Sequence, residues 1–286
     1  MTVFVLKITV AVLICLVVLW LYLICPALRR HPHGDILRGT AVAHRGLYDA
    51  EAGIPENSMP AYRRAIAAGY PIELDIHVTL DGQLVVFHDH NPERICGVPG
   101  RIERMTLAEL RALRLGGTDL VMPTLEEVLE LVDGQVPLLI EFKCEDFRTC
   151  RRLCRTADRV LSQYEGIYLV QSFFPFVSAW YRFHRPEVCR GQLASSYWGC
   201  PDRDKHSRLI LTMSGALLFN VFGRPDFISY DIGFPRAWGR YLCRRLFLAG
   251  TAGWTIRSQE ALEHEQRRNG MCIFEGFLPK EESEAG

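Results

Sequence analysis

The segment Ile72-Glu-Leu-Asp-Ile-His-Val-Thr-Leu-Asp-Gly-Gln-Leu-Val-Val-Phe-His-Asp89 decides the fold of this chain. Two short apolar, β-prone runs flank Asp81-Gly82, and an Asp-Gly pair between such runs is typical of a two-residue type I′ hairpin turn. If these two residues form the turn, His88 on the second strand lies opposite Asp75 on the first.

Glu73 and Asp75 are two positions apart in the first strand, so both side chains leave the same face. Two carboxylates at one place, with the His88 imidazole delivered from the partner strand, indicate a hard-cation site next to a proton-transfer group. The alternative is the polar outer face of an ordinary hairpin. The rest of the chain favours the cation site.

Buried strand-like runs alternate with helix-compatible sequence along the chain. At 286 residues the chain has room for one α/β barrel or for two smaller domains. Capping signals predict helices over 59–68, 107–115, 125–132 and 147–164. Strands are predicted over 39–46, 72–89, 136–143, 167–173, 189–194, 226–231, 251–257 and 271–276. Counting the second half of the hairpin as an excursion, the strands number eight, which predicts a (β/α)8 TIM-type barrel.

Polar residues fall at the carboxyl ends of the predicted strands, which share one mouth in a barrel. They are His44-Arg45, Glu73-x-Asp75, Glu141-x-Lys143 and Gln171-Ser172. Glu73, Asp75 and Glu141 offer oxygen ligands without a cysteine, which favours Mg²⁺ or Ca²⁺ over zinc.

These residues suit the cleavage of a phosphodiester. Arg45 and Lys143 could hold a phosphate beside the cation. His44 and His88 could exchange the roles of base and acid, because the nucleophile loses a proton and the leaving alkoxide gains one. Five other histidines, His77, His90, His184, His206 and His264, lack such a set of carboxylates and cations at the predicted mouth and are interpreted as surface or core residues.

Composition narrows the function class. Lys plus Arg and Asp plus Glu both number 33, which argues against a general nucleic-acid binder. The ten cysteines form no Cys-x-x-Cys pair and no zinc-ribbon spacing, so they are expected to be reduced.

The first residues predict a membrane anchor. Residues 3–25 carry one charge, Lys7, and are apolar for long enough to cross a bilayer. A cleaved signal peptide is the alternative, but the apolar stretch is longer than usual and no Ala-x-Ala-like site follows. The expected organisation is an anchor over 1–26, a linker over 27–39, the barrel over 40–279 and an acidic, disordered tail over 280–286. Arg29, Arg30 and Arg38 follow the span, so the positive-inside rule places the barrel in the cytoplasm.

Two further stretches have two interpretations each. Five arginines share one helical face, either as a solvated stripe or as a contact for anionic lipid; they are Arg148, Arg151, Arg152, Arg155 and Arg159. Residues 209–222 are apolar but too short to span, so they form a core helix or an apolar lip near the membrane.

The sequence resembles the glycerophosphodiester phosphodiesterase family from about residue 40 to residue 279. The resemblance rests on a series of motifs in order: His44-Arg45-Gly46, Glu56-Asn57-Ser58, Glu73-Leu-Asp75, Asp81-Gly82 with His88-Asp89, Pro123-Thr124-Leu125-Glu126-Glu127, Glu141-Phe-Lys143, Ser172-Phe173 and Trp254-Thr255. Where the family often ends its last strand in Thr-Asp, this chain has Glu275-Gly276. The family motif therefore does not predict the detail of this rim loop.

The resemblance implies a divalent metal held by Glu73, Asp75 and Glu141, acid-base work by His44 and His88, and phosphate contacts from Arg45 and Lys143. It makes Glu56, Asn57, Asp89, Ser172 and Trp254 possible supporting residues. The implied reaction is hydrolysis of a glycerophosphodiester to sn-glycerol 3-phosphate and an alcohol such as choline.

Two other functions stay open. Some relatives with these motifs resemble lysophospholipase D enzymes, and the anchor would keep the barrel mouth near lipid phosphodiesters. A catalytically silent, membrane-tethered ligand-binding barrel is the alternative from another class, although retention of both histidines and all three carboxylates argues against it. No protein partner is evident from the sequence.

Overall fold

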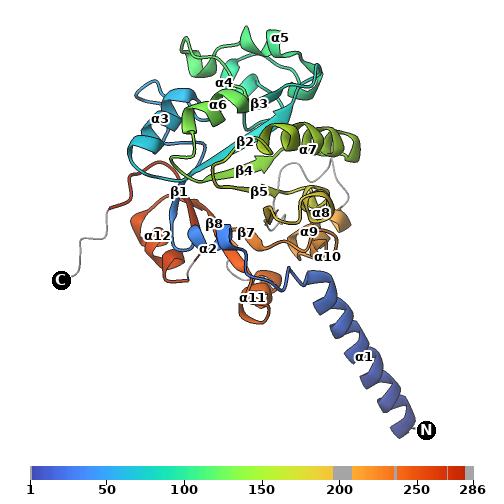
Figure 1. Ribbon diagram of the computed structural model, residues 1–286. Helices are drawn as coiled ribbons and strands as arrows, with labels where there is room; N and C mark the ends of the chain where they lie inside the picture. The colour runs from blue at the N-terminus through green and yellow to red at the C-terminus, as the bar shows by residue number, and fades with distance from the viewer. Residues whose placement is uncertain (1, 196–207, 235–236, 269, 281–286) are drawn as a thin grey trace, which may run out of the picture.

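A computed structural model describes residues 2–195, 208–234, 237–268 and 270–280 (Figure 1). The expected acidic tail lies almost wholly outside the described residues, as do His206 and Cys200. The nine cysteines within the described ranges are free thiols.

Eight parallel strands close into a barrel, as the sequence predicts. Each strand pairs with the next around the ring, and β1 pairs with both β2 and the last strand. The barrel strands are β1 (Ala41–Ala43), β2 (Ile72–Val78), β4 (Leu138–Phe142), β5 (Tyr168–Ser172), β6 (Cys189–Ala194), β7 (Phe227–Asp231), β8 (Gly250–Ile256) and β9 (Met271–Phe274). The remaining strand, β3 (Leu84–Val86), pairs antiparallel with β2 outside the ring.

Helices surround the barrel, and one long helix projects from it (Figure 1). They are α1 (Thr2–Ile24), α2 (Pro32–Ile36), α3 (Met59–Ala67), α4 (Glu93–Cys96), α5 (Leu107–Arg111), α6 (Leu125–Val132), α7 (Phe147–Leu161), α8 (Pro175–His184), α9 (Arg208–Gly215), α10 (Asn220–Gly223), α11 (Trp238–Arg245) and α12 (Gln259–Gln266), with 3-10 turns at Ile102–Arg104 and Leu115–Gly117. The capping boxes predicted at Thr106 and Thr124 are both formed.

The two faces of the sheet bury different residues. Strand residues such as Leu74 and Ile140 pack outward against the helices in the largest apolar cluster. Residues of the opposite parity, including Leu139, Leu169 and Phe227, form a second cluster that fills the barrel. Because side chains alternate along each strand, this filling places Glu73, Glu141 and Gln171 on the inward side, nearer the carboxyl ends.

Gly191 in β6 leaves room for the ring of Phe227, which a Cβ at this position would strike. We expect Gly191→Ala to lower the free energy of unfolding by about 1–3 kcal/mol, because overpacking forces neighbouring side chains to shift. Denaturant unfolding of the purified protein measures this loss. An equally stable variant would contradict the packing described for this layer.

The hairpin prediction is wrong by one position. The register pairs Val78 with Leu84, and the amide of Phe87 donates to the carbonyl of Asp75 (3.0 Å), so Phe87 rather than His88 lies opposite Asp75. The loop has three residues, closed by a bond from the Thr79 amide to the Gln83 carbonyl (2.9 Å), with Gly82 left-handed at φ 82°.

Asp81 explains the longer loop, because its carboxylate accepts from the Thr79 hydroxyl (2.6 Å) and from the Leu107 amide (3.1 Å). A three-residue loop with glycine in the left-handed position is the next most common hairpin after the two-residue turn.

The N-terminal helix α1 is long and apolar enough to cross a membrane. Its central residues are exposed, and Ile24 is its one buried residue within the described range. A buried core helix of a soluble protein does not have this exposure, whereas a membrane span and a signal sequence both do.

The two ambiguous stretches differ in their surroundings. Residues 209–222 form α9 and α10 with the turn between them; Leu217 and Asn220 are buried, whereas Leu209 and Ile210 are exposed. Helix α7, which carries the five arginines, lies on the part of the barrel away from α1 (Figure 1). Its Arg152 donates to the carbonyls of Val78 and Thr79, which ties α7 to the hairpin.

Candidate active site

Three carboxylates meet at the carboxyl ends of two neighbouring strands. Asp75 of β2 pairs in register with Glu141 of β4, and Glu73 precedes Asp75 on the same face. One oxygen from each of the three lies within 4.8 Å of the others, and all three side chains are buried. The structure therefore brings together the acidic residues that the sequence predicts as metal ligands.

Two cations lie among these acids. The Lys143 ammonium contacts Asp75 Oδ1 at 2.9 Å and Glu141 Oε1 at 2.5 Å. The Arg45 guanidinium donates to Glu56 Oε1 (2.8 Å), and its Nε lies 3.8 Å from Asp75 Oδ2 without a hydrogen-bond partner among the described residues. Arg45 has a left-handed backbone at φ 57°, and its amide donates to Glu73 Oε2 (3.2 Å).

Burial and mutual repulsion set the charge state of the acids. Burial, together with the charges of Asp75 and Glu141, raises the pKa of Glu73 well above its ordinary value. Burial acts the same way on Asp75, but the charges of Lys143, His88 and Arg45 outweigh it and lower the pKa of Asp75.

The donor set fits a divalent cation. Three carboxylates face two cations here, so one negative charge is left over when all are ionised. The excess negative charge opposes the ionisation of Glu73, whose pKa is raised. Carboxylate oxygens without sulfur are the ligands of hard cations such as Mg²⁺ and Ca²⁺. A divalent ion would replace the proton that Glu73 otherwise holds.

His44 is oriented by a residue from the other end of the chain. Closure of the barrel places β9 beside β1, and His44 Nδ1 lies 2.5 Å from Glu275 Oε2. Burial would raise the pKa of Glu275, but its bonds to His44 and the charge of Arg257 lower it to about 2. An ionised carboxylate accepts only, so Nδ1 donates and Nε2 faces Glu73 Oε2 at 3.9 Å.

His88 is held in a similar way by its neighbour in the chain. Its Nδ1 lies 2.6 Å from Asp89 Oδ1, and Asp89 also accepts from Arg94 Nε at 2.5 Å. Arg94 in turn donates to Glu56, the carboxylate that accepts from Arg45. Each histidine thus has one ring nitrogen fixed by a carboxylate, and the other nitrogen is left for a ligand.

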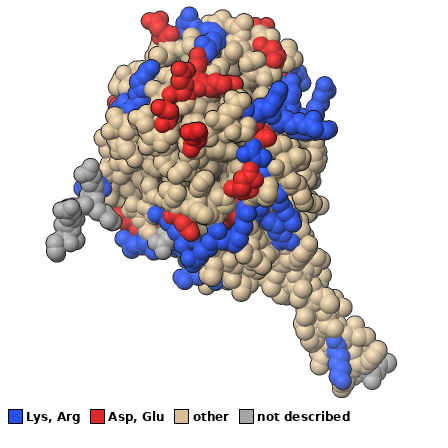
Figure 2. Space-filling view, viewed as in Figure 1, with Lys and Arg blue, Asp and Glu red and all other residues tan. Residues whose placement is uncertain are grey.

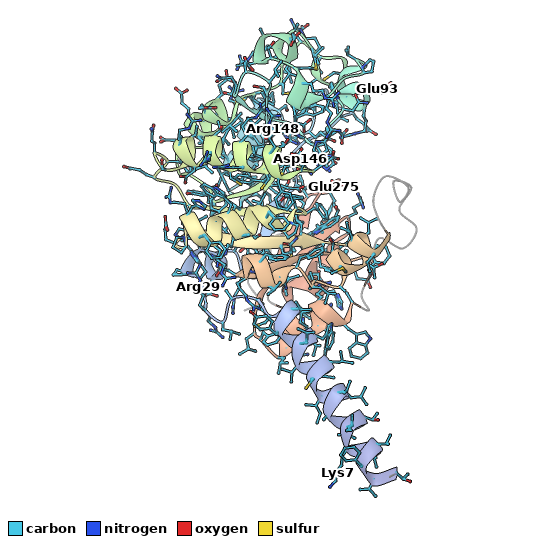
Figure 3. All side chains as sticks on the ribbon, turned by 90° about the vertical axis from the view of Figure 1, so that its right-hand side faces the viewer. Lys7, Arg29, Glu93, Asp146, Arg148 and Glu275 are labelled. Carbon is cyan, nitrogen blue, oxygen red and sulfur yellow. The ribbon has the colours of Figure 1, made fainter. Side chains whose placement is uncertain are left out.

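A small cavity of about 70 Å³ opens between these groups at the barrel mouth. Figure 3 labels Glu275, the carboxylate that holds His44 of the cavity wall. Polar and apolar residues line it: His44, Arg45, Glu73, His88, Glu141, Gln171, Phe173, Leu193, Trp254, Thr255 and Ile273. Asp75 and Lys143 do not line the cavity, but they contact residues that do.

The supporting residues differ in what they contact. Asn57 donates to Asp75 Oδ2 (2.9 Å) and accepts from the Tyr62 hydroxyl (2.8 Å). Trp254 lines the cavity. Ser172 does not: its hydroxyl donates to the Phe142 carbonyl (2.7 Å) and joins two strands.

Sequence reasoning left three features of the site unassigned. Glu275 appeared only as an uncertain rim residue, although an eight-stranded closure predicts that the last strand lies beside His44. Gln171 was noted as polar, and its buried Oε1 has no partner among the described residues. Phe173 packs edge-on to Trp254 at 5.7 Å between ring centroids, which gives the cavity an aromatic wall.

His77, which is fully buried, and His90 share an acidic neighbour that the sequence did not indicate. Both Nδ1 atoms lie against Glu103 Oε1, at 3.0 Å and 2.5 Å. Glu103 follows a loop whose path the sequence does not predict, so this contact was not visible in the spacing of the motifs.

The protein is thus a parallel eight-stranded barrel with a cluster of carboxylates and histidines at its mouth. Residues 44–171 match the model of the glycerophosphoryl diester phosphodiesterase family. Together with the curated relatives, this match places residues 44–171 in the glycerophosphoryl diester phosphodiesterase family. The resemblance noted in the sequence is confirmed over residues 44–171; Ser172, Trp254 and Glu275 lie beyond the matched residues.

Curated relatives match part of the chain. A glycerophosphodiester phosphodiesterase of Caldanaerobacter subterraneus is 38% identical over 115 residues, covering 37% of this chain and 46% of the relative. Lysophospholipase D GDPD1 of Rattus norvegicus is 30% identical over 167 residues, covering 54% of this chain and 51% of the relative. The matched part thus spans about half the length of these relatives.

Solved structures match the fold more completely. An Oleispira antarctica phosphodiesterase, solved in complex with the product sn-glycerol-3-phosphate, gives a TM-score of 0.67 at 21% identity, covering 85% of this chain and 94% of that one. A Silicibacter pomeroyi protein of the same fold gives a TM-score of 0.66 at 21% identity, covering 85% of this chain and 93% of that one. At this identity the likeness concerns the fold.

Proposed function

We propose that the chain is a phosphoric diester hydrolase that cleaves glycerophosphodiesters to sn-glycerol 3-phosphate and an alcohol. The observation that carries the proposal is the joint placement of His44 and His88 at one cavity with the three buried carboxylates. The family match over residues 44–171 and the curated relatives support it.

The two histidines would share the proton transfers. Burial lowers the pKa of His44, which favours its neutral form near pH 7 and suits it to accept a proton from the nucleophile. His88, fixed by Asp89, is then the group that returns a proton to the leaving alkoxide. With Nδ1 of each ring held by a carboxylate, Nε2 is the atom that exchanges the proton.

The charged residues would bind and orient the phosphate. The free Nε of Arg45 is a donor for a phosphoryl oxygen, while its Nη1 stays on Glu56. Lys143 would add positive charge at the same end of the cavity. Glu73, Asp75 and Glu141 would hold Mg²⁺ or Ca²⁺, which when bound stabilises negative charge on the phosphoryl oxygens.

The test is product release by the purified protein after chelation, with Mg²⁺ or Ca²⁺ added back and glycerophosphocholine as substrate. Metal-dependent release of choline is expected. If neither this diester nor other headgroups are cleaved, and His88→Ala behaves like the wild type, the proposal fails and the silent ligand-binding barrel takes its place.

Glu275→Gln is expected to lower kcat by about tenfold or more, because it removes the charge that fixes the His44 tautomer. The Glu275 charge raises the pKa of His44, so its loss should move the acidic limb of the pH–rate profile to lower pH. Steady-state kinetics across pH measures both effects. Glu263→Gln on exposed α12 is the matched control, and an unchanged profile in Glu275→Gln would contradict a positioning role.

A second candidate is lysophospholipase D activity on membrane lysophospholipids. Two observations favour it: the match to a relative of that name and the exposed apolar helix α1. We propose that α1 is a single membrane span, with the barrel on the cytoplasmic side because Arg29, Arg30 and Arg38 follow it. Faster choline release from lysophosphatidylcholine than from glycerophosphocholine would favour this function over the first.

A further inference from the structure

The barrel-side end of α1 is docked on the barrel. The Ile24 carbonyl accepts from Asn220 Nδ2 at 2.8 Å, and Ile24 itself is fully buried. Arg224 Nη1 donates to the carbonyls of Tyr22 (2.8 Å) and Cys25 (2.6 Å), and its guanidinium lies 4.6 Å from the Tyr22 ring centroid. These bonds satisfy carbonyls that a helix end leaves without partners, so they fix α1 against α10.

The length of α1 determines where the elements packed against its docked end would lie relative to a bilayer. Its 23 residues span about 34 Å at 1.5 Å per residue, close to the roughly 30 Å hydrocarbon thickness of a bilayer. If α1 spans the membrane, it is only slightly longer than the hydrocarbon layer, so its docked end lies at the lipid headgroups. Trp20 and Leu21 pack into the same apolar cluster as Leu242 and Phe247, so the α11 region lies at that depth too.

The α11 region and α10, which contacts α11 through Asn220 and Cys243, expose large apolar side chains. Trp238 is 73% exposed, Leu248 65%, Leu246 55%, Tyr241 52% and Phe222 41%. We call these five residues the interfacial face. The Trp238 and Tyr241 rings lie 6.1 Å apart edge to face, and such aromatic pairs are enriched where proteins meet the bilayer surface.

The sequence around α11 is basic. The sequence from Ile232 to Ser258 contains no Asp or Glu, and it includes Arg244 and Arg245 in the last turn of α11. Figure 2 shows Lys and Arg gathered on the part of the barrel next to α1. On α11, Gly239 and Cys243 are buried, while Trp238, Tyr241 and Arg245 face outward. Exposed Trp and Tyr rings suit the headgroup level of a bilayer, and neighbouring arginines are attracted to anionic lipid.

We propose that the interfacial face rests in the headgroup region of a bilayer containing anionic lipid, as a second attachment beside α1. The proposal rests on the membrane span put forward above. Its occupant is the lipid surface because the face is continuous with the docked end of α1 and carries complementary charge. This attachment would hold the barrel in one orientation on the membrane rather than leave it to swing on a tether.

The test measures quenching of Trp238 in membranes. Full-length protein is reconstituted in vesicles of phosphatidylcholine and phosphatidylglycerol, with and without bromine on the upper acyl carbons. The fluorescence lost in Trp238→Phe is taken as the Trp238 contribution. We expect brominated lipid to quench most of that contribution, and vesicles without anionic lipid to give less quenching. Trp180→Phe is the matched control, because Trp180 lies outside the interfacial face and packs against Tyr181 (5.1 Å) and His184 (4.4 Å) of α8, so its contribution should be quenched less.

Each outcome decides between the two membrane claims. Flotation of the wild type with vesicles after alkaline washing tests the span by itself. A chain that floats but has an unquenched Trp238 overturns the interfacial face while the span stands. A chain that does not float overturns the span, and with it this inference. An unquenched Trp238 in a protein that elutes as a dimer from detergent would assign the face to a second copy. Equal unfolding temperatures of the variants in detergent exclude misfolding.

Discussion

Replacing His44 by alanine is expected to lower kcat by about a hundredfold to ten-thousandfold, the usual contribution of a positioned acid-base group. His44 is the group whose ring lies between Glu275 and Glu73, and the other histidine of the cavity has its own carboxylate partner. Removing the imidazole leaves Glu73 without a histidine partner among the described residues. Choline release from glycerophosphocholine under saturating substrate and metal measures the loss.

The fold should survive this change. Glu275 keeps its two bonds to Arg257 (2.9 and 2.6 Å), so its carboxylate is not left unpaired when His44 is removed. The matched control is His264→Ala, whose side chain is 53% exposed on α12. A near-normal rate in His44→Ala, with metal affinity and unfolding temperature also unchanged, would remove His44 from the proposed mechanism.

The barrel was predictable because its signals are local and repeated. Buried strands alternate with capped helices, and a parallel sheet with such crossovers gathers the strand ends at one mouth. Glu73, Asp75 and Glu141 could therefore be placed together before any coordinates, since each follows an apolar run on a defined parity. The same reasoning placed His44 and Arg45 at that mouth.

What sequence reasoning missed depends on contacts that no local pattern encodes. The hairpin register shifted because Asp81 bonds to Leu107, a residue far along the chain. Glu103 reaches His77 and His90 through an irregular segment. The contact between Glu275 and His44 was predictable, because closing eight strands brings β9 beside β1. Comparison with the family motif alone did not indicate it.

Replacing Glu73 by glutamine is expected to abolish metal-dependent activity, leaving the rate of the chelated wild type. The side chain keeps its size but loses the charge, and it is the carboxylate that lies between Asp75, Glu141 and His44. Calorimetric titration with Mg²⁺ or Ca²⁺ measures the loss of binding, and choline release measures the loss of activity. Glu130→Gln on the exposed side of α6 is the matched control.

Measurements of Tm distinguish the loss of metal binding in Glu73→Gln from unfolding of the variant. The pKa of Glu73 is raised in the folded protein, so without metal its ionisation costs stability as pH rises above about 4.3, the ordinary value for a glutamate, toward the raised folded value. A bound divalent cation replaces the proton, so the metal-induced rise in Tm should grow with pH in the wild type. Glu73→Gln has no proton to lose there, so its Tm without metal should not fall below the wild type, and added metal should not raise it. A metal-induced rise in Tm that persists in Glu73→Gln with its dependence on pH would place the cation elsewhere in the protein.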